Sequence, residues 1–524
     1  MLKEQRVDEH AAPRPVDPAG PEMFGHPKGL YYLFFAELWE RFSFYGMRAL
    51  LVLYMVNDLF VNQTNRDDIA FGIYAAYGAL VYATPVIGGL IADRLIGFRR
   101  AVMLGAVLMA LGHFALAVEN PLFFYGALAL LIVGNGFFKP NISTLVGTLY
   151  REGDPRRDAG FTIFYMGINI GAAISPLVCG WLGVEYGWHY GFGAAGVGML
   201  VGLFFFWNGA RSGVFGDRGL PPDPVALRQK VGGISRGNWV TVLSFIILPL
   251  FMLLLYHGQL DLPGLGTVEF TGTLIGYAIN YVLLPVILLI LIVTMYNSSK
   301  VERERLLVVV LLTFFITVFW SFFEQSGSSI TLFAERNVNL TFLNAAQTNS
   351  INPAFIVLFA IPFSAMWVWL SRLRWNPYTP VKFAMGIAQL GLGFLIFTWS
   401  ANFADAEGRV PMLFLVLGYM FITTGELFIS PVGLSKVTEL SPKKILAFIM
   451  GVWFISSSFA HHIAGIIAKL TSVAPLEEGA EVSGFESLAT YTGVFEQIGY
   501  IALAFAVLAL IMTPLMRKWM HGIH

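Results

Sequence analysis

The sequence predicts an all-α polytopic membrane protein, and three observations lead to this fold class. Apolar residues make up 56% of the 524 residues, whereas charged residues make up only 13%. Soluble domains carry about 25% charged residues, so this chain cannot cover a soluble surface of that size. Its apolar residues gather in fourteen runs, each long enough to cross about 30 Å of hydrocarbon as a helix. The chain is also too hydrophobic for intrinsic disorder.

The remaining composition excludes several classes of protein and site. The chain has a single cysteine, Cys179, which rules out an intrachain disulfide and a cysteine-rich metal site. The formal net charge is zero, so a nucleic-acid partner has no electrostatic support. Residues 1–28 are polar and rich in proline, and we expect a cytoplasmic N-terminal tail there rather than a cleavable signal peptide.

The first six spans fill residues 29–208, which we expect to form an N-terminal bundle. No polar face recurs along these runs, as is expected of helices that are surrounded by lipid or by other helices. The spans are predicted at 30–57, 69–92, 101–118, 121–149, 159–184 and 188–209.

Residues 209–305 connect the two halves of the chain. They begin with a long basic loop that contains Pro221, Pro222 and Pro224, and they continue with two further spans at 238–257 and 270–297. This region is predicted to be a cytoplasmic linker followed by two extra transmembrane helices.

Six more spans fill residues 306–517 and are expected to form a C-terminal bundle, before a cytoplasmic tail at 518–524. Two halves of six spans with a long connection suggest two bundles that rock about a central site. The spans are predicted at 306–330, 350–371, 379–402, 411–434, 445–468 and 491–516.

Basic residues predict the orientation of these spans. The N-terminus and the even-numbered connections hold 26 of the 33 Lys and Arg residues, whereas the odd-numbered connections hold 4. Because cytoplasmic loops are enriched in Lys and Arg, both termini are expected in the cytoplasm. This needs an even number of spans, which fourteen satisfies and which twelve or sixteen would satisfy equally.

Seven charged residues are predicted deep inside the spans. Glu496 lies near the outer end of the last span, and Lys382 is counted with the basic connection that leads into the span at 379–402. Each of the seven costs at least about 2.5–3.5 kcal/mol at mid-membrane unless it is paired or hydrated, so we expect them to face one another or a water-filled cavity. The alternative is a salt-bridge network that only fixes helix packing, but buried ion pairs are poor stabilisers. The seven residues are Glu37, Glu40, Arg41, Arg48, Lys139, Glu324 and Glu426.

The first span carries the densest cluster of these charges. Glu37, Glu40, Arg41, Tyr45 and Arg48 recur at spacings that place them on one face of a helix. The order Glu37 before Arg41 is the favourable one for an ion pair four residues apart.

The motif that runs from Glu37 to Gly46, E-L-W-E-R-F-S-F-Y-G, resembles the E-x-x-E-R-F-x-Y-Y-G motif of the proton-dependent oligopeptide transporter family. Further stretches in the same order are similar to that family: 88–97, 164–171, 319–325 and 352–353. The resemblance covers residues 30–517. It implies a major facilitator fold with twelve core helices, and the two extra helices resemble those of bacterial members. The expected location is therefore the bacterial plasma (inner) membrane.

The resemblance also implies roles for individual residues. Proton coupling would use Glu37, Glu40, Arg41, Lys139 and Glu324. The N-terminal half of a peptide pocket would contain Tyr45, Arg48, Tyr82, Lys139, Tyr165 and Asn169. The C-terminal half would contain Trp320, Glu324, Asn352, Glu426, Ser430 and Trp453.

Two departures from the family pattern matter. Phe44 stands where many members have tyrosine, so no phenol is present there. Some members carry a histidine in the second span, but this chain has none between His26 and His113. Proton coupling through such a histidine is therefore excluded.

The sequence contains two further features of interest, a charged stretch at Asp93 and Arg94 and the adjacent histidines His461 and His462. Asp93 and Arg94 belong to a stretch that looks like the facilitator hairpin between helices two and three. We expect a cytoplasmic gate there, and a tight charged turn is the alternative. We interpret His461 and His462 as core histidines with satisfied hydrogen bonds. His461 projects from its predicted helix within a quarter turn of the direction of Trp453, so a pocket role for His461 stays open.

The function implied by the resemblance is a proton-coupled symporter that imports di- and tripeptides by alternating access. It would work as a monomer, with protons as the coupling ion and with no cofactor or metal. One alternative is a proton-coupled carrier of nitrate or of an amphipathic metabolite. A more remote alternative is an intramembrane enzyme. No Asp lies deep in a span and no H-E-x-x-H motif is present, although a buried Ser/His pair stays open.

Overall fold

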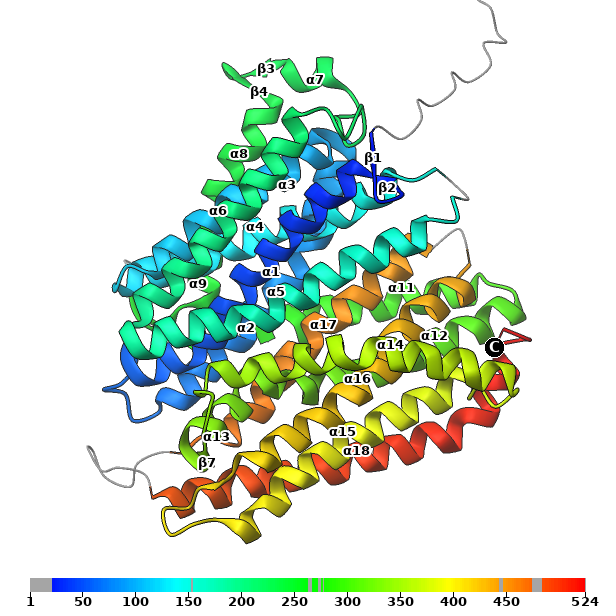
Figure 1. Cartoon of the computed structure of the whole chain (residues 1–524). Coiled ribbons are helices and arrows are strands. Elements are labelled where there is room, and N and C mark those ends of the chain that lie inside the picture. The colour runs from blue at the N-terminus through cyan, green and yellow to red at the C-terminus, as the bar shows by residue number, and fades with distance from the viewer. Residues whose placement is uncertain are drawn as a thin grey trace, which may run out of the picture.

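A computed structural model of the chain consists of long helices that pack in two bundles, with a helical hairpin between them in the sequence (Figure 1). The structure describes residues 21–151, 154–262, 266–271, 275–276, 278–442, 446–473 and 483–523.

Six long helices form the N-terminal bundle. Helix α1 packs against α5 and α6, and α4 packs against α2 and α3. The contact between α2 and α4 is very close, because a Cβ atom on Gly88 would lie 2.0 Å from the Gly136 carbonyl oxygen. The helices are α1 (Lys28–Tyr54, continued by a π-helical turn Met55–Leu59), α2 (Arg66–Ile91), α3 (Phe98–Leu116), α4 (Pro121–Thr148), α5 (Arg157–Tyr186) and α6 (Trp188–Arg211).

The connecting region contains short elements and the two extra spans. The first extra span is divided into α8 and α9, and the second consists of a π-helical turn η3 and α11. The predicted start of the second span at residue 270 is wrong, because the alternating residues up to Thr271 form a strand. The elements are α7 (Pro224–Arg228), β3 (Lys230–Val231), β4 (Ile234–Ser235), α8 (Arg236–Ile246), α9 (Leu248–Leu255), β5 (His257–Leu262), β6 (Gly266–Thr271), η3 (Ala278–Leu283) and α11 (Leu284–Tyr296).

The C-terminal bundle differs from the prediction mainly in its first span, which is interrupted. Helix α12 ends at Phe323, a 3₁₀ turn η4 follows, and the chain becomes helical again after Ser328, whose φ and ψ are −130° and −98°. The elements are α12 (Lys300–Phe323), η4 (Glu324–Gly327), α13 (Ser329–Asn337), the 3₁₀ turn η5 (Gln347–Ser350), α14 (Ile351–Arg372), α15 (Thr379–Trp399), the 3₁₀ turn η6 (Ser400–Phe403), α16 (Met412–Leu440), α17 (Leu446–Lys469) and α18 (Gly484–Trp519).

Strands are short and peripheral. In addition to the pairs in the connecting region, β1 (Glu22–Met23) pairs antiparallel with β2 (His26–Pro27), and β7 (Val338–Asn339) pairs parallel with β8 (Val410–Pro411). The prediction of an all-α polytopic membrane protein is therefore confirmed.

Thirteen helical segments in the described part of the chain are long and apolar enough to cross a membrane. Helix α1 is the fourteenth, and its 27 residues are long enough as well. It differs from the others in its charge, since Glu37, Glu40, Arg41 and Arg48 all lie within it. A helix is thus present at each of the fourteen predicted spans, whereas the domain boundaries at 28, 208, 305 and 517 stay a prediction.

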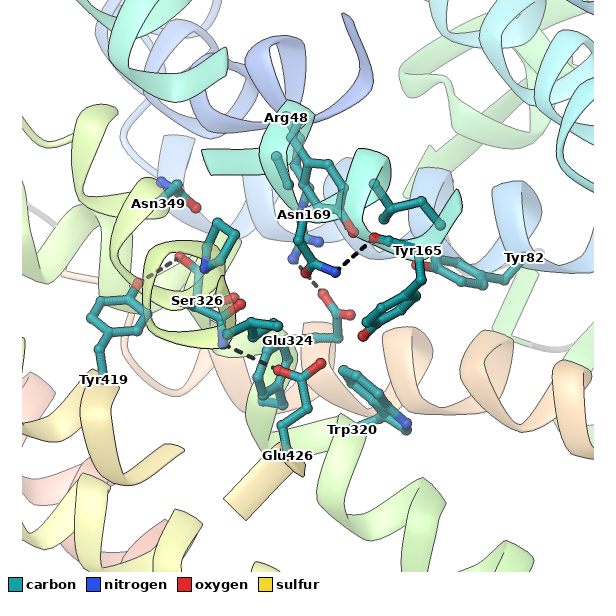
Figure 2. Close-up of a pocket in the computed structure, with 17 residues that line it drawn as sticks. Arg48, Tyr82, Tyr165, Asn169, Trp320, Glu324, Ser326, Asn349, Tyr419 and Glu426 are labelled. Carbon is teal, nitrogen blue, oxygen red and sulfur yellow. Dashed lines mark hydrogen bonds and ion pairs between the residues drawn. The ribbon is translucent and has the colours of Figure 1, made fainter. Parts of the chain in front are cut away.

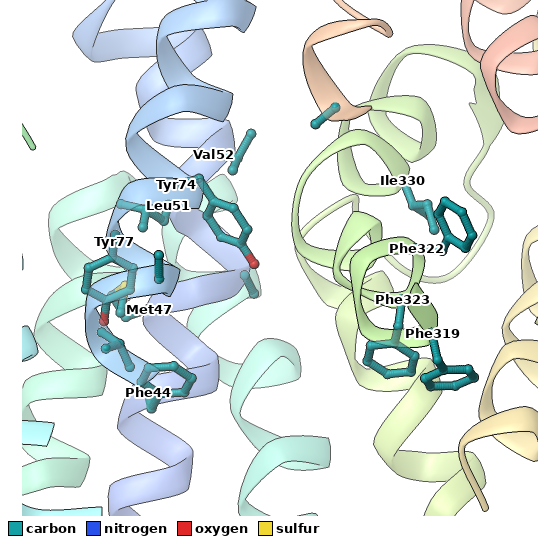
Figure 3. Close-up of a cluster of buried hydrophobic side chains, with 14 of the residues drawn as sticks. Phe44, Met47, Leu51, Val52, Tyr74, Tyr77, Phe319, Phe322, Phe323 and Ile330 are labelled. Carbon is teal, nitrogen blue, oxygen red and sulfur yellow. The ribbon is translucent and has the colours of Figure 1, made fainter. Parts of the chain in front are cut away.

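Buried apolar side chains fill the space between the helices of both bundles. Figure 3 shows Phe44, Met47 and Leu51 of α1 on one side, and Phe319 and Phe323 of α12 on the other. The polar residues described below lie between these apolar clusters.

Polar contacts between the two bundles gather at one end of the molecule. Helix α1 begins and α18 ends at the end that we call the tail end, which lies at the right of Figure 1. At the opposite end, the far end, Arg336 donates to both carboxylate oxygens of Asp67, at 2.6 and 2.8 Å. The Asn57 amide donates to Glu335 at 2.7 Å, and the Asn344 amide donates to the Gly180 carbonyl at 3.1 Å. The far end is therefore closed.

Candidate functional site

A cavity of about 170 Å³ lies between the two bundles, and both bundles line it (Figure 2). One wall comes from α1, α2 and α5, and the other comes from α12, η4, η5, α14 and α16. Nine of the predicted pocket residues line it: Tyr45, Arg48, Tyr82, Tyr165, Asn169, Trp320, Glu324, Asn352 and Glu426. The structure brings these side chains together from distant parts of the sequence, and their roles in binding stay a prediction.

An ion pair joins the two walls of the cavity. Arg48 of α1 donates from Nη2 to Oε2 of Glu324 at 2.5 Å, and its Nε donates to the Tyr74 hydroxyl at 2.5 Å. Both charged side chains are largely buried. Because Glu324 lies where α12 gives way to η4, the interruption of the helix places this carboxylate opposite α1.

Glu426 provides a second acid on the C-terminal wall. The Asn352 amide donates to Glu426 Oε2 at 3.1 Å and to the Thr423 hydroxyl at 3.0 Å. In the part of the chain that the structure describes, no Lys or Arg forms an ion pair with Glu426. A cationic group in the cavity would therefore find an acid that no basic side chain neutralises.

The predicted proton-coupling residues of α1 form a separate buried cluster. Arg41 Nε lies 3.1 Å from Glu37 Oε1 and also donates to Glu40. Among the described residues, one oxygen of each carboxylate and Arg41 Nη2 have no hydrogen-bond partner. The Arg41 guanidinium lies 5.4 Å from the centre of the Phe44 ring, which occupies the place of the family tyrosine. These three charged residues do not line the cavity.

Lys139 is also outside the cavity lining. Its ammonium nitrogen lies 4.1 Å from the centre of the Tyr82 ring, and Tyr82 itself lines the cavity. A cation over an aromatic face is attracted by the ring quadrupole, so Lys139 packs on a residue of the cavity lining without being part of the lining itself.

Two other predicted pocket residues lie away from the lining. Trp453 is buried, and its ring lies so close to α16 that a Cβ on Gly433 would be 2.7 Å from it. Ser430 lies one turn after Glu426 on α16, and its hydroxyl has no partner among the residues described.

The sequence analysis missed three polar residues of the lining, Ser326, Asn349 and Tyr419. The Tyr419 hydroxyl donates to the Ser326 carbonyl oxygen at 3.4 Å. Helical spacing could have indicated two of them, because Tyr419 lies two turns before Glu426 and Asn349 lies three residues before Asn352. The missed apolar lining residues are Ile168, Ala172, Phe323, Pro353 and Ile356.

The predicted cytoplasmic gate residues, Asp93 and Arg94, are exposed in a π-helical turn, Ala92–Ile96, between α2 and α3. They are not among the residues that line the cavity. Their role in gating stays a prediction.

The interpretation of His461 as a histidine with satisfied hydrogen bonds is wrong. Its ring is buried, yet neither ring nitrogen has a hydrogen-bond partner in the described chain. Its Nε2 atom lies 3.7 Å from Glu324 Oε1, which is too far for a hydrogen bond. The adjacent His462 does have a polar neighbour, since its Nε2 lies 3.2 Å from the Asn280 amide nitrogen.

Among the described residues, no group of three or more His, Cys, Asp or Glu side chains could hold a metal ion. The charged groups of the cavity can instead bind a ligand through opposite charges on its two walls.

Comparisons with known proteins agree on one family. A model of the POT family matches residues 99–485. The chain is 37% identical over 469 residues to the peptide transporter YePEPT of Yersinia enterocolitica subsp. palearctica, with 86% of this chain and 89% of the relative covered. It is 36% identical over 470 residues to the di-/tripeptide transporter of Lactococcus lactis subsp. lactis, with 86% and 91% covered.

A solved structure of the peptide transporter POT in complex with sulfate is similar over almost the whole chain. The TM-score is 0.80 and the sequence identity is 34%, with 96% of this chain and 97% of that chain covered. This likeness confirms the expected major facilitator fold. Together with the family match, it shows that the chain belongs to the proton-dependent oligopeptide transporter (POT) family.

Proposed function

We propose that this protein is a proton-coupled symporter that imports di- and tripeptides by alternating access. The observation that carries the proposal is the charge on the two walls of the cavity, with Arg48 on the N-terminal wall and Glu426 on the C-terminal wall. A zwitterionic peptide fits between them, with its carboxylate toward Arg48 and its amine toward Glu426. The attraction is strong because the cavity walls have a low dielectric constant.

The relatives support the substrate class. The matched proteins of Yersinia and Lactococcus are named as a peptide transporter and a di-/tripeptide transporter. Charges that hold the peptide termini leave the side chains to contact aromatic residues such as Trp320 and Tyr165, so we expect a broad tolerance of side chains. Family membership makes the protein a secondary transporter and not an enzyme.

Charge balance supports protons as the coupling ion. The intramembrane charges are three cations (Arg41, Arg48 and Lys139) and four acids (Glu37, Glu40, Glu324 and Glu426). One proton therefore makes the set neutral, which lowers the cost of burying it during the transport cycle. No other cofactor is needed. A single chain supplies both walls of the cavity, so a monomer is sufficient.

We infer from the positive-inside rule that the basic residues of the tail end lie in the cytoplasm, and that the membrane is the plasma (inner) membrane of a bacterium. The closed far end then faces outward. In this state a peptide would not reach the cavity from outside.

The test is uptake of labelled dialanine into proteoliposomes with and without an inward proton gradient. We expect accumulation only with the gradient, and loss of accumulation in Arg48→Ala. Arg228→Ala is the matched control, because Arg228 is exposed in α7 and remote from the cavity. Accumulation that ignores the gradient would contradict proton coupling. Failure of a folded wild-type protein to take up dialanine, while nitrate accumulates, would contradict the substrate class.

A further inference from the structure

His461 occupies an unusual place, since it lies at a contact between the two bundles. It belongs to α17 of the C-terminal bundle, and its ring fits into a notch on α2 of the N-terminal bundle. The notch exists because α2 has a glycine there: a Cβ on Gly78 would lie 2.5 Å from His461 Nδ1. One turn earlier, the Ser458 hydroxyl donates to the Ala79 carbonyl oxygen at 2.8 Å, so the same two helices are also joined by a hydrogen bond.

The ring of His461 has polar neighbours, but in the described chain none of them forms a hydrogen bond with its nitrogen atoms. Only 4% of the residue is exposed, and neither ring nitrogen has a hydrogen-bond partner among the described residues. A neutral imidazole has one donor and one acceptor nitrogen, and both are left unused. Burying an imidazole without hydrogen-bond partners costs free energy. This cost indicates that the charged form of the ring has a function.

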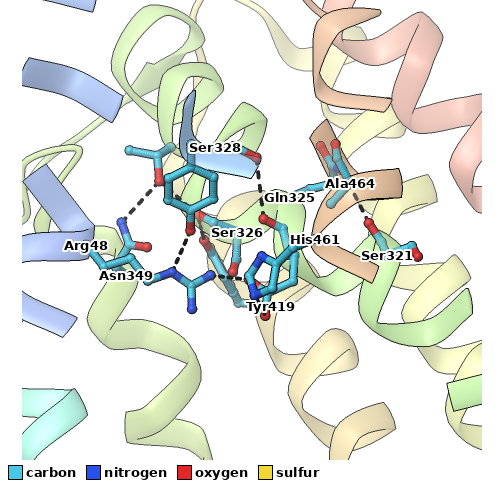
Figure 4. A network of polar contacts seen from close by, with 12 residues as sticks. Arg48, Ser321, Gln325, Ser326, Ser328, Asn349, Tyr419, His461 and Ala464 are labelled. Atoms are coloured by element: carbon cyan, nitrogen blue, oxygen red, sulfur yellow. Dashed lines mark hydrogen bonds and ion pairs between the residues drawn. The ribbon is translucent and has the colours of Figure 1, made fainter. Parts of the chain in front are cut away.

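Ionisable groups lie near His461 on η4, α2, α4 and α1. Glu324 of η4 is the nearest, with Oε1 at 3.7 Å from His461 Nε2. The Tyr82 ring of α2 lies 5.0 Å away between centres, and Lys139 of α4 lies on Tyr82. Arg48 of α1 completes the group, because it holds the other oxygen of Glu324. Figure 4 shows Arg48 and His461 in this polar network between the bundles.

We propose that His461 is a proton-binding site at the bundle interface, and that its protonated form competes with Arg48 for Glu324. This rests on the proposed function, and it adds a residue to the coupling machinery that the family motifs do not include. A histidine is suited to the task because it changes charge close to neutral pH.

The geometry indicates how the competition would work. Glu324 offers one oxygen to Arg48 and the other to His461. When His461 is neutral, Arg48 is the only cation that pairs with Glu324 in the described chain, and the ion pair ties α1 to η4. When His461 gains a proton, Glu324 is shared between two cations, and the hold on Arg48 weakens. Arg48 is then free to bind the carboxylate of a peptide in the cavity that it lines.

This arrangement couples proton binding to peptide binding. If protonation of His461 favours binding of the peptide carboxylate by Arg48, then bound peptide favours protonation by the same factor. Departure of the peptide returns Arg48 to Glu324 and expels the proton. Both ligands would thus enter and leave together.

The experiment measures the affinity of purified full-length protein for dialanine as a function of pH, from about 5.5 to about 8 around the ordinary histidine range. We expect the wild-type affinity to rise at least about fivefold as the pH falls, the lower limit of usual coupling between two sites. In His461→Gln, which keeps a polar side chain but cannot be charged, the change should fall below about twofold, a factor smaller than usual coupling.

Two further variants make the test decisive. His462→Gln is the matched control, because this adjacent histidine faces Asn280 of η3 rather than Glu324, and its pH response should equal that of the wild type. Gly78→Ala keeps the histidine but fills the notch, so the ring must leave its present position beside Gly78 and Glu324. We expect this displacement to change the pH response, and the variant decides the matter if His461→Gln does not fold.

A wild-type pH response that persists in His461→Gln and Gly78→Ala would overturn the proposal and move the proton to an acid such as Glu324. A wild-type affinity that does not depend on pH would also overturn it. If the folded wild type binds no dialanine at any pH, the proposed function itself fails. Proteoliposome assays on the same variants add a second readout: His461→Gln should lose gradient-driven accumulation and retain peptide counterflow.

Discussion

Glu426 faces the cavity without a basic partner in the described chain, whereas Glu324 is already paired with Arg48. If Glu426 holds the peptide amine, N-acetyl-dialanine should compete for uptake at least about tenfold less well than dialanine, because a charged hydrogen bond is lost. In Glu426→Gln the two competitors should differ much less. Inhibition curves against labelled dialanine provide the measurement, and equal competition in the wild type would remove the amine assignment.

The cluster on α1 has two acids for one guanidinium, and one oxygen of each acid is unpartnered in the described chain. Glu37→Gln and Glu40→Gln should each lose proton-driven accumulation but keep some peptide counterflow, since counterflow needs no net proton movement. Both assays are run on the same proteoliposomes. Glu119→Gln, a change at an exposed acid, is the control. Intact accumulation in both variants would move the proton site off α1, and Glu324 is the next residue to test.

Lys139 is a point charge that lies over the Tyr82 ring. Lys139→Ala should abolish gradient-driven uptake, because the two acids of α1 then have Arg41 alone as a compensating cation. Lys139→Arg should be impaired too, since a planar guanidinium does not replace a compact ammonium in this confined place. Uptake and the amount of folded protein are measured together. Wild-type uptake by the alanine variant would show that Lys139 only fills space.

The resemblance to the family named most of the lining residues, whereas helical spacing grouped the charged residues of the first span, of which Arg48 lines the cavity. Glu37, Arg41 and Arg48 could be grouped in this way because α1 is a regular helix. Spacing could not find Ser326, which lies in the 3₁₀ turn η4, where the helical periodicity no longer applies. It also could not show that Lys139 packs on Tyr82, because that depends on how α2 and α4 pack.

The crossing of α2 and α4 depends on the absence of a side chain. A Cβ on Gly88 would lie 2.0 Å from a backbone carbonyl oxygen of α4, whereas a Cβ on Gly89 would lie 3.7 Å from the Pro140 ring, an ordinary contact. Gly88→Ala should therefore destabilise the protein by about 1–3 kcal/mol, the usual cost of overpacking. Gly89→Ala is its matched control. Thermal unfolding in detergent measures both, and equal melting temperatures would show that the helices can separate without cost.

At the level of helices, length and hydropathy predicted the presence of each span but not its interruptions. Helix α12 gives way to η4 at Glu324. Because the run around Glu324 is otherwise apolar, the hydropathy pattern predicts one continuous helix there. The second extra span begins later than predicted, because the apolar residues Val268 and Phe270 belong to strand β6. Apolar residues are common to buried strands and membrane helices, so composition alone cannot separate the two here.

The closed far end leads to a prediction about the whole transport cycle. Asn57 of the N-terminal bundle and Glu335 of the C-terminal bundle are joined by a hydrogen bond of 2.7 Å. In Asn57→Cys with Glu335→Cys, a short thiol-specific cross-linker should block transport, and a cleavable cross-linker should restore it on reduction, because alternating access requires this end to open.

The control pair is Glu119→Cys with His189→Cys. These side chains lie 3.1 Å apart at the same end but within one bundle, so cross-linking them should leave transport unchanged. The single native cysteine, Cys179, is buried and does not interfere. Transport by the cross-linked Asn57/Glu335 variant would mean that the far end stays closed throughout the cycle.

The number of spans and their expected orientation could be predicted from the sequence, because both follow from the positions of apolar and basic residues along the chain. It could not show which end is closed. That depends on contacts between residues far apart in the chain, such as Asp67 with Arg336, and on the relative position of two bundles that each fold around their own helices. The same bundles in another relative position would have the same sequence pattern.

The charge of α1 has a consequence for biogenesis. Apart from Lys28 at its first position, four charged residues lie within this helix, and each disfavours insertion by about 2.5–3.5 kcal/mol at the membrane centre. The partners of Glu37, Glu40 and Arg41 lie within α1 itself, but the partner of Arg48 is Glu324, which is synthesised 276 residues later. Helices α5 and α6, which pack against α1, also emerge after it. The first span to leave the ribosome is therefore poorly suited to reside alone in lipid, and its stable integration waits for the rest of the chain.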